Sequence, residues 1–461
     1  MKSSYKNLLK DTLVFSIGSL GSKLILFLMV PLYTNYMSDA EYGTAELVFT
    51  IAQLMAPFIS VVIFDAVIRF GLSRNEKKEN VILVGAVVFL ISAAVGLFIT
   101  PIVGLYEAVS HWKWYLYAYV VVNIANSIEL NYIKAKGYNK AFALLGIAQT
   151  ALMAGLNVLF LVKQNMGIQG YLLAYILANV VIDIIALFIG RIPKDLRNAH
   201  FDNRLFKEMI WYSAPLIFNN VSWWIIHSSD KIMVEVMISA SALGIYTVAA
   251  KIPSLINVIV TIFQQAWGIS SVREIETTND TAYYSNVFKY YVLFTSGACL
   301  ALVSIIRLFM RYYVGNDFQD AWKYVPLLLV SAVYASIASY YGSLYGALKK
   351  SVNNMLTTLA AAAVNIIVNV IFIPIVGIWG AVIGTVVSYM VLAFARMFDV
   401  GRYIKITVEY RKLLANMLLI IAQAVLVSFE ISIVITSSVC IFLFLINNYP
   451  DLKSLVVKKK Q

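Results

Sequence analysis

Residues 81–100 read VILVGAVVFLISAAVGLFIT, a stretch without a single charged side chain. A helix rises about 1.5 Å per residue, so a stretch of this length crosses the hydrocarbon core of a bilayer. The rest of the chain is of the same kind, since 61% of its 461 residues are hydrophobic and 13% are charged. Soluble domains carry roughly 25% charged residues. The composition therefore excludes an ordinary soluble protein and predicts an all-α integral membrane protein.

Fourteen stretches of the chain are long and apolar enough to span a membrane. The last two are separated only by Glu430, so a single re-entrant pair is the alternative there. The first contains Lys23 and lacks a small-residue cleavage site, which argues against a cleavable signal peptide. The approximate limits of the expected spans are 11–36, 43–68, 80–103, 112–133, 140–162, 167–190, 208–236, 243–270, 284–309, 322–347, 352–374, 376–398, 411–429 and 431–447.

The formal net charge of +12 is explained mainly by topology. Of the 36 basic residues, 28 fall in one alternating set of loops and span ends, Lys289 and Arg396 among them, and five fall in the other set. Because cytoplasmic loops retain Lys and Arg, both termini are predicted to be cytoplasmic. Three lysines remain inside the expected spans, namely Lys23, Lys231 and Lys251.

The second half of the chain repeats landmarks of the first half. The segment Ser38-Asp39-Ala40-Glu41-Tyr42-Gly43 matches Ser239-Ala240-Ser241-Ala242-Leu243-Gly244, and Gly167-Ile168-Gln169-Gly170 matches Gly377-Ile378-Trp379-Gly380. Six spans per unit give both units the same topology, related by a pseudo-two-fold axis along the membrane normal. We expect two six-helix lobes, residues 1–200 and 201–408, followed by two extra helices and a basic tail in residues 409–461.

Polar side chains recur on corresponding helix faces of the two halves, in spans 1, 2, 7 and 8. Polar groups inside a bilayer are costly and usually face a cavity or a partner helix. We therefore predict that these four helices line one central cavity. Its charges are mainly basic, which suits an anionic group such as a phosphate. The predicted substrate-facing residues are Lys23, Gln53, Asn220, His227, Lys231 and Lys251.

A structural role is the alternative for the charged members of this set. Glu46 paired with Lys251, or Lys231 paired with Asp230 or Glu235, would hold helices together without contacting a substrate. The sequence alone leaves both interpretations open.

Several intramembrane acids are candidates for ion coupling or for a gate. Asp65 and Arg69 lie four residues apart, so they form either a simple helix pair or part of an inner gate. Glu129 follows two asparagines in the fourth span, where coupling to a proton or sodium gradient and an ordinary structural role are equally open. The predicted coupling or gating residues are Glu46, Asp65, Arg69, Glu129 and Asp230.

Motifs in spans 1, 2, 7 and 8 resemble those of bacterial polysaccharide and O-antigen repeat-unit flippases, members of the multidrug/oligosaccharidyl-lipid/polysaccharide exporter superfamily. The resemblance implies alternating-access transport of undecaprenyl-pyrophosphate-linked oligosaccharide from the cytoplasmic to the outer leaflet of the bacterial inner membrane, for O-antigen, capsule or exopolysaccharide. It further implies that Lys23, Lys231 and Lys251 serve the pyrophosphate or anionic sugars. Membrane lipids and polysaccharide polymerase machinery are the expected partners, and no cofactor is expected. These motifs are Pro31-Leu32-Tyr33, Glu41-Tyr42-Gly43, Asp230-Lys231-Ile232-Met233, Leu243-Gly244-Ile245-Tyr246 and Ala250-Lys251-Ile252.

Two other functions remain as alternatives. A multidrug or other lipid-precursor exporter has the same architecture, although drug cations favour an acidic cavity. A membrane polymerase or glycosyltransferase needs a catalytic cluster, and the short outer loops carry no convincing one. We expect no metal site, no direct ATP drive because a P-loop motif is missing, and no nucleic-acid partner.

Overall fold

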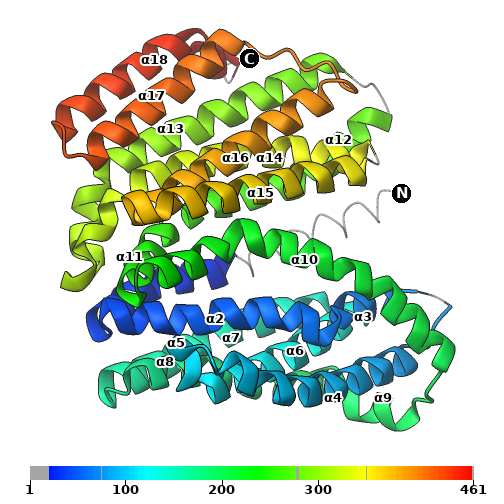
Figure 1. Cartoon of the computed structure of the whole chain (residues 1–461). Helices are drawn as coiled ribbons and strands as arrows, with labels where there is room; N and C mark the ends of the chain where they lie inside the picture. Colours follow the sequence, from blue (N-terminus) through cyan, green and yellow to red (C-terminus); the bar gives the residue numbers. More distant parts are fainter. Residues whose placement is uncertain (1–19, 74, 277–279, 349, 459–461) are drawn as a thin grey trace. The chain divides into compact units, whose positions relative to one another are not determined.

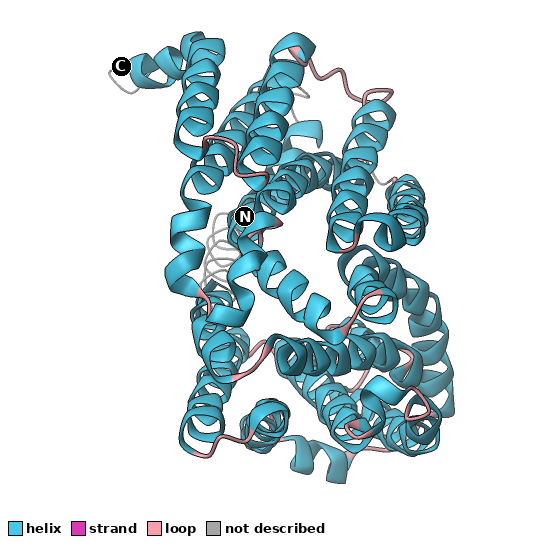
Figure 2. Cartoon of the chain, turned by 60° about the vertical axis from the view of Figure 1, so that its left-hand side comes forward, coloured by secondary structure: helices cyan, strands magenta, loops and turns pink. Residues whose placement is uncertain are grey.

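The computed structural model describes residues 20–73, 75–276, 280–348 and 350–458, and every regular element among these residues is helical (Figure 2). Residues 11–19 of the first expected span, and the basic residues nearest both chain ends, lie outside the described residues. The helices divide into two compact units, Met1–Glu235 and Val236–Gln461. The prediction of an all-helical fold is confirmed for the part of the chain that the structure describes.

In the first unit, a helix through residues 20–36 is followed by a bundle of long helices (Figure 1). Helix α6 lies at its centre, because it packs against α2, α3, α4 and α8. The elements are α2 (Asp39–Ser60), α3 (Ile63–Gly71), α4 (Lys78–Val103), α5 (Glu107–Ser110), α6 (Lys113–Ala135), α7 (Asn139–Asn157), the π-helix η1 (Val158–Lys163), α8 (Gly167–Ile189), α9 (Ile192–Asn198) and α10 (Asn203–Met237).

In the second unit, α14 is the most buried helix and packs against α12, α13, α16 and α17. The last two helices pack against each other and against α13, so they are part of this unit. The elements are α11 (Ala240–Lys251), α12 (Ser254–Glu276), α13 (Thr281–Tyr313), the 3-10 helix η2 (Asn316–Lys323), α14 (Val325–Ala347), α15 (Ser351–Val376), α16 (Ile378–Val400), α17 (Tyr410–Ser428) and α18 (Ile433–Lys458).

Ten helices of the described residues are long and apolar enough to cross a membrane, and an eleventh is added if the bent pair α11–α12 counts as one span. The expected spans 112–133 and 208–236 are also helical, in α6 and α10, although they are less apolar. The predicted total of fourteen is therefore approximate. Large apolar side chains on the outside, such as Phe98, Phe188 and Ile375, are more than 70% exposed, as expected for helices in contact with lipid.

The sequence landmarks shared by the two halves have the same local structure in each unit. The hydroxyls of Ser38 and Ser239 accept hydrogen bonds from backbone N–H groups three residues later, and so cap α2 and α11. Gly167 and Gly377 both have a positive φ, of 52° and 63°. Such a backbone conformation favours glycine, which explains why these glycines recur where α8 and α16 begin.

Two expected spans, 43–68 and 243–270, are each interrupted by a break between two helices. Between α2 and α3, Val61 and Val62 adopt left-handed conformations with φ of 51° and 54°, which are unusual for β-branched residues. In the second unit, α11 and α12 meet at an angle of 45° around Pro253. The break at Pro253 follows from the missing backbone N–H of proline, whereas Pro57 lies inside α2 without ending it.

Candidate functional site

Helix α10 carries a lysine into the first unit, where it meets a buried carboxylate. Lys231 Nζ donates to Glu46 Oε2 on α2 over 2.9 Å. The side chains of Lys231 and Glu46 are only 19% and 7% exposed. Because charges in such a setting are poorly hydrated, each depends on the other for compensation.

The second oxygen of Glu46 faces a cluster of aromatic rings. The Tyr171 hydroxyl on α8 donates to Glu46 Oε1 over 3.3 Å. The ring of Tyr171 meets Tyr33 edge-on at 4.8 Å between centroids and lies 5.5 Å from Phe49. Tyr42 and Tyr171 are both fully buried. Glu46 therefore has an ammonium on one oxygen, a phenol on the other, and a rigid apolar wall beside it.

Two further hydrogen bonds fix α10 along the first unit. The indole N–H of Trp224 donates to the backbone carbonyl of Thr50 over 3.1 Å, one helical turn beyond Glu46 on α2. The Tyr106 hydroxyl, which precedes α5, donates to the Glu235 carboxylate. These contacts hold Trp224 beside α2 and Glu235 beside the segment before α5, on either side of the Lys231–Glu46 pair.

Lys231 pairs with neither of the two partners, Asp230 and Glu235, that the sequence suggested for it. Glu46 was expected with Lys251, and Lys231 with Asp230 or Glu235. The structure pairs Glu46 with Lys231 and gives Glu235 the Tyr106 hydroxyl as a partner. The reason is spatial, since α10 packs within the first unit as far as Glu235.

Other predicted substrate residues of the first unit are spread along their helices. Lys23 and Gln53 are exposed, and Asn220 is half-buried and donates to the Leu216 carbonyl of its own helix. His227 is also exposed and stacks on Trp223, with 5.6 Å between ring centroids. The contact of these four residues with a substrate remains a prediction.

The remaining lysine of the predicted set belongs to the second unit. Lys251 is the last residue of α11 and is half-buried at the bend before α12. Asp230, one of the predicted coupling residues, is 3% exposed and directly precedes Lys231 on α10. The common cavity that joins the lysines of both halves stays a prediction.

Asp65 and Arg69 on α3 do not form the expected helix pair. Asp65 is half-buried and Arg69 is exposed, and no ion pair within 4.0 Å joins them in the described structure. The charged group that interacts electrostatically with Asp65 is Lys134 of α6. Arg69 points away because α3 turns its buried face toward α4 and α6.

Glu129 lies in a polar cluster between α6, α7 and α8. Its Oε2 atom is buried and has no hydrogen-bond partner in the described structure. Asp183 of α8 acts on it electrostatically and accepts a hydrogen bond of 2.7 Å from Asn126. One turn away, Gln149 donates to Asn179. Two acids and three amides thus meet inside the first unit, as suits a group that gains and loses a proton.

Comparison with known protein families shows to which family the chain belongs. A family model described as polysaccharide biosynthesis protein matches residues 8–268, which is more than half of the chain. The chain belongs to the polysaccharide biosynthesis protein family. The matched region includes residues 8–235 of the first unit and therefore the pair of Lys231 and Glu46.

Solved structures show which fold this family member has. The lipid II flippase MurJ in an inward closed conformation is similar with a TM-score of 0.72 and 14% identity, over 96% of this chain and 100% of that one. An outward-facing multidrug resistance MATE transporter of the MOP superfamily is similar with a TM-score of 0.58 and 18% identity, over 86% and 94%. The polysaccharide biosynthesis family member is therefore a multi-pass membrane protein with the fold of MOP transporters.

Among curated proteins, an Lsg locus protein of Haemophilus influenzae is 21% identical over 261 residues. A membrane protein of the same organism is 22% identical over 266 residues. Each alignment covers 56% of this chain and 64% of the relative, so the chain spans less than two thirds of the relatives it matches.

The roles of two residues of this family member were not predicted from its sequence. Tyr171 was not singled out, although a tyrosine within an apolar span signals that its hydroxyl needs a partner. Arg396 was assigned to the loop set, but it is 3% exposed inside α16. Its guanidinium donates to the Ala338 carbonyl and to the Thr358 hydroxyl, both over 2.9 Å. It was misassigned because it lies close to the end of the helix.

Proposed function

We propose that this member of the polysaccharide biosynthesis family is a flippase for undecaprenyl-pyrophosphate-linked oligosaccharide repeat units. It would move them by alternating access from the cytoplasmic to the outer leaflet of the bacterial inner membrane, for O-antigen, capsule or exopolysaccharide. Family membership and the MOP transporter fold support a transporter. The observation that carries the choice of an anionic substrate is the Lys231–Glu46 pair.

The proposed step is an exchange of partners at Lys231. A phosphate oxygen offers the ammonium the same kind of charge-assisted hydrogen bond as the Glu46 carboxylate does. Glu46, which is 5% exposed, then gives up the ammonium of Lys231. A buried carboxylate whose charge is less well compensated is costly, and uptake of a proton makes it neutral. Substrate binding and proton uptake are thereby linked in one pair, without a covalent step or a cofactor.

The exchange is tested in a strain that lacks the gene and carries the wild type, Lys231→Met or Lys163→Met. Lys163 is an exposed lysine of the same unit and serves as the matched control. We expect Lys231→Met to abolish surface polysaccharide at an unchanged membrane level of the protein, and Lys163→Met to leave the polymer unchanged. Normal polymer with Lys231→Met would overturn the proposal. A change in drug accumulation with intact polymer would favour the multidrug exporter.

A further inference from the structure

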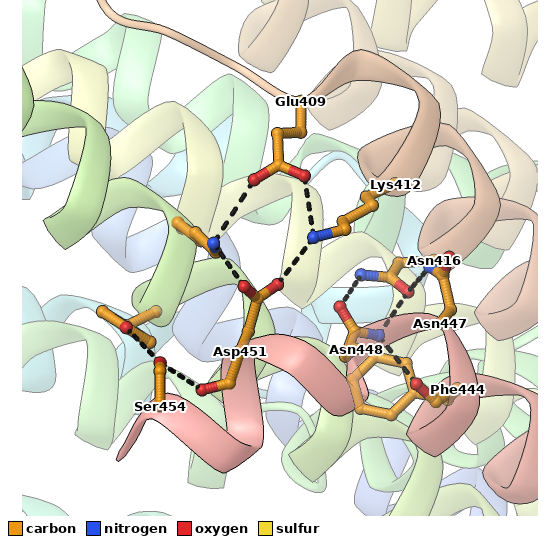
Figure 3. Close-up of polar contacts among 10 residues, drawn as sticks. Glu409, Lys412, Asn416, Phe444, Asn447, Asn448, Asp451 and Ser454 are labelled. Carbon is orange, nitrogen blue, oxygen red and sulfur yellow. Dashed lines mark hydrogen bonds and ion pairs between the residues drawn. The ribbon is translucent and has the colours of Figure 1, made fainter. Parts of the chain in front are cut away.

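Four charged side chains form a closed ring where α13, α17 and α18 meet (Figure 3). Lys412 Nζ lies 2.7 Å from Glu409 Oε2 and 3.0 Å from Asp451 Oδ2. Lys289 Nζ lies 3.3 Å from Glu409 Oε1 and also pairs with Asp451 Oδ1. Each carboxylate therefore bridges both ammonium groups with its two oxygens.

The two carboxylates of this ring differ in accessibility. The Asp451 side chain is 8% exposed, whereas that of Glu409 is 49% exposed. Glu409 directly precedes α17, at the end of the non-helical segment that follows α16. The ammonium groups of Lys412 and then Lys289 hold the pKa of Glu409 below its ordinary value. Asp451 is thus the buried carboxylate of the ring, and Glu409 is the carboxylate that solvent and ligands reach.

An open pocket of about 60 Å³ adjoins the ring. One part of its wall is apolar and comes from Phe288, Val292, Leu293 and Leu413. The rest comes from the charged ring and from amides of α17 and α18, which hydrogen-bond to one another (Figure 3). The pocket is therefore amphipathic, with two cations and two anions beside an apolar surface.

The ring lies at the level where lipid headgroups are expected. Tyr410 and Tyr449, at this end of α17 and α18, are 52% and 62% exposed, and exposed tyrosines concentrate at membrane interfaces. Helix α13 has 33 residues, a length of about 50 Å that exceeds the hydrocarbon thickness of about 30 Å. Its first turns, which carry Lys289, then extend into the interface. The distribution of basic residues predicts that this is the cytoplasmic side.

We propose that this pocket binds the headgroup of a phospholipid with a primary ammonium, of the phosphatidylethanolamine class. The phosphodiester takes the place of the Glu409 oxygens across Lys289 and Lys412, while Glu409 accepts hydrogen bonds from the lipid ammonium. All charges are then balanced, because Asp451 keeps bridging both lysines. The acyl chains lie in the bilayer beside the pocket, and only the part of the lipid next to the headgroup contacts the apolar wall.

Charge and donor chemistry separate this ligand from other phospholipids. Phosphatidylglycerol supplies the phosphate but leaves the Glu409 carboxylate without a cation. Phosphatidylcholine has the same net charge as phosphatidylethanolamine, but its quaternary ammonium has no N–H to donate. Free phosphoethanolamine has both charges and lacks the acyl chains, so the apolar wall contributes nothing to its binding.

The test uses the full-length protein, purified in detergent and freed of lipid, with retained lipid measured by native mass spectrometry. The lipids are phosphatidylethanolamine, phosphatidylglycerol and phosphatidylcholine with identical acyl chains, and free phosphoethanolamine is added as a fourth ligand. We expect phosphatidylethanolamine to bind best. Lys412→Gln removes a charge-assisted hydrogen bond and should weaken this binding roughly tenfold. Glu409→Gln should shift the preference to phosphatidylglycerol.

Lys453→Gln is the matched control, since Lys453 is an exposed lysine of α18 that does not line the pocket. If Lys412→Gln lowers the melting temperature, Lys412→Arg keeps the cation and should restore lipid binding. Equal binding of phosphatidylethanolamine and phosphatidylcholine would overturn the proposal, as would unchanged binding to Lys412→Gln or equal binding of free phosphoethanolamine. Lys231→Met should leave lipid binding unchanged, because Lys231 does not line this pocket. The lipid-binding result therefore tests this proposal separately from the proposed transport function.

Discussion

Lys231 and Glu46 are 185 positions apart in the chain and form an ion pair of 2.9 Å inside the first unit. The pair joins the end of α10 to the first half of α2, and Tyr171 of α8 contacts its carboxylate from the other side. Three helices therefore meet at one carboxylate. Any change of partner at Glu46 alters contacts of all three helices, which is what a transport step between two conformations requires.

Breaking this pair from one side should cost stability, whereas removing both charges should cost much less. Glu46→Gln or Lys231→Met deprives the remaining, poorly hydrated charge of its opposite charge in this pair, so each should destabilise the protein by on the order of 3 kcal/mol. The double variant Glu46→Gln/Lys231→Met should recover most of this loss. Thermal unfolding in detergent of the wild type, both single variants and the double variant measures the coupling.

The same double variant separates the role of Lys231 in transport from its role in folding. It should be present in the membrane at the wild-type level and still fail to support surface polysaccharide, because it lacks the cation that we propose receives the phosphate. Additive destabilisation by the two substitutions would show that the ion pair contributes little. Restored polymer in the double variant would show that the pair is structural only.

Removal of the Tyr171 hydroxyl should have a smaller effect of the same kind. Tyr171→Phe keeps the ring contacts and deletes the hydrogen bond to Glu46 Oε1, which should lower stability by about 1 kcal/mol. Tyr115→Phe is the control, since the Tyr115 hydroxyl has no hydrogen bond among the described residues. Equal melting temperatures for Tyr171→Phe and the wild type would contradict the prediction.

Local features of the fold could be predicted because they depend on neighbouring residues. The apolar stretch 81–100 lies inside α4, as expected. Ser38 and Ser239, recognised only as repeated landmarks, prove to be N-caps, and the positive φ of Gly167 and Gly377 explains their recurrence. Helix length, capping and turn chemistry act over a few residues, so one sequence is sufficient to detect them.

Partner choice between distant helices could not be predicted in this way. Glu46 lies opposite Lys231, and Thr50 lies beside Trp224, in a register of α10 on α2 that no sequence spacing encodes. Arg396 illustrates the same limit. A basic residue near a helix end is typical of a cytoplasmic loop, and only the packing of α14, α15 and α16 buries this one.

The buried Arg396 should not tolerate replacement by lysine. Its guanidinium reaches α14 and α15 from α16, and a lysine ammonium cannot reproduce this planar arrangement of donors. Arg396→Lys should therefore lower stability by about 1.5–3 kcal/mol, the value of one lost hydrogen bond to a charged group. Arg402→Lys is the control, because that side chain is 77% exposed. Similar unfolding temperatures for the two variants would contradict the structural role of Arg396.

Replacement of Glu129 should affect ion coupling more than folding. Glu129→Gln replaces an ionisable group at a partly buried site beside Asp183 with a neutral amide of the same shape, so the variant should be at least as stable as the wild type. If Glu129 carries the coupled proton, transport by this variant in vesicles should no longer respond to an imposed proton gradient. Glu107→Gln, at an exposed site of the same unit, should respond like the wild type. A normal response of Glu129→Gln would exclude Glu129 as the carrier.

Glycine at the break between α2 and α3 should stabilise the protein. Val61 has φ 51° and ψ 26°, a conformation that costs a β-branched residue on the order of 1–3 kcal/mol and costs glycine little. Val61→Gly should therefore raise the melting temperature, despite the loss of a half-buried side chain. Val121→Gly, at a half-buried position in the helical backbone of α6, should lower it, because glycine costs about 1 kcal/mol in a helix interior. If both substitutions lower the melting temperature by the same amount, the left-handed backbone at Val61 stores no strain.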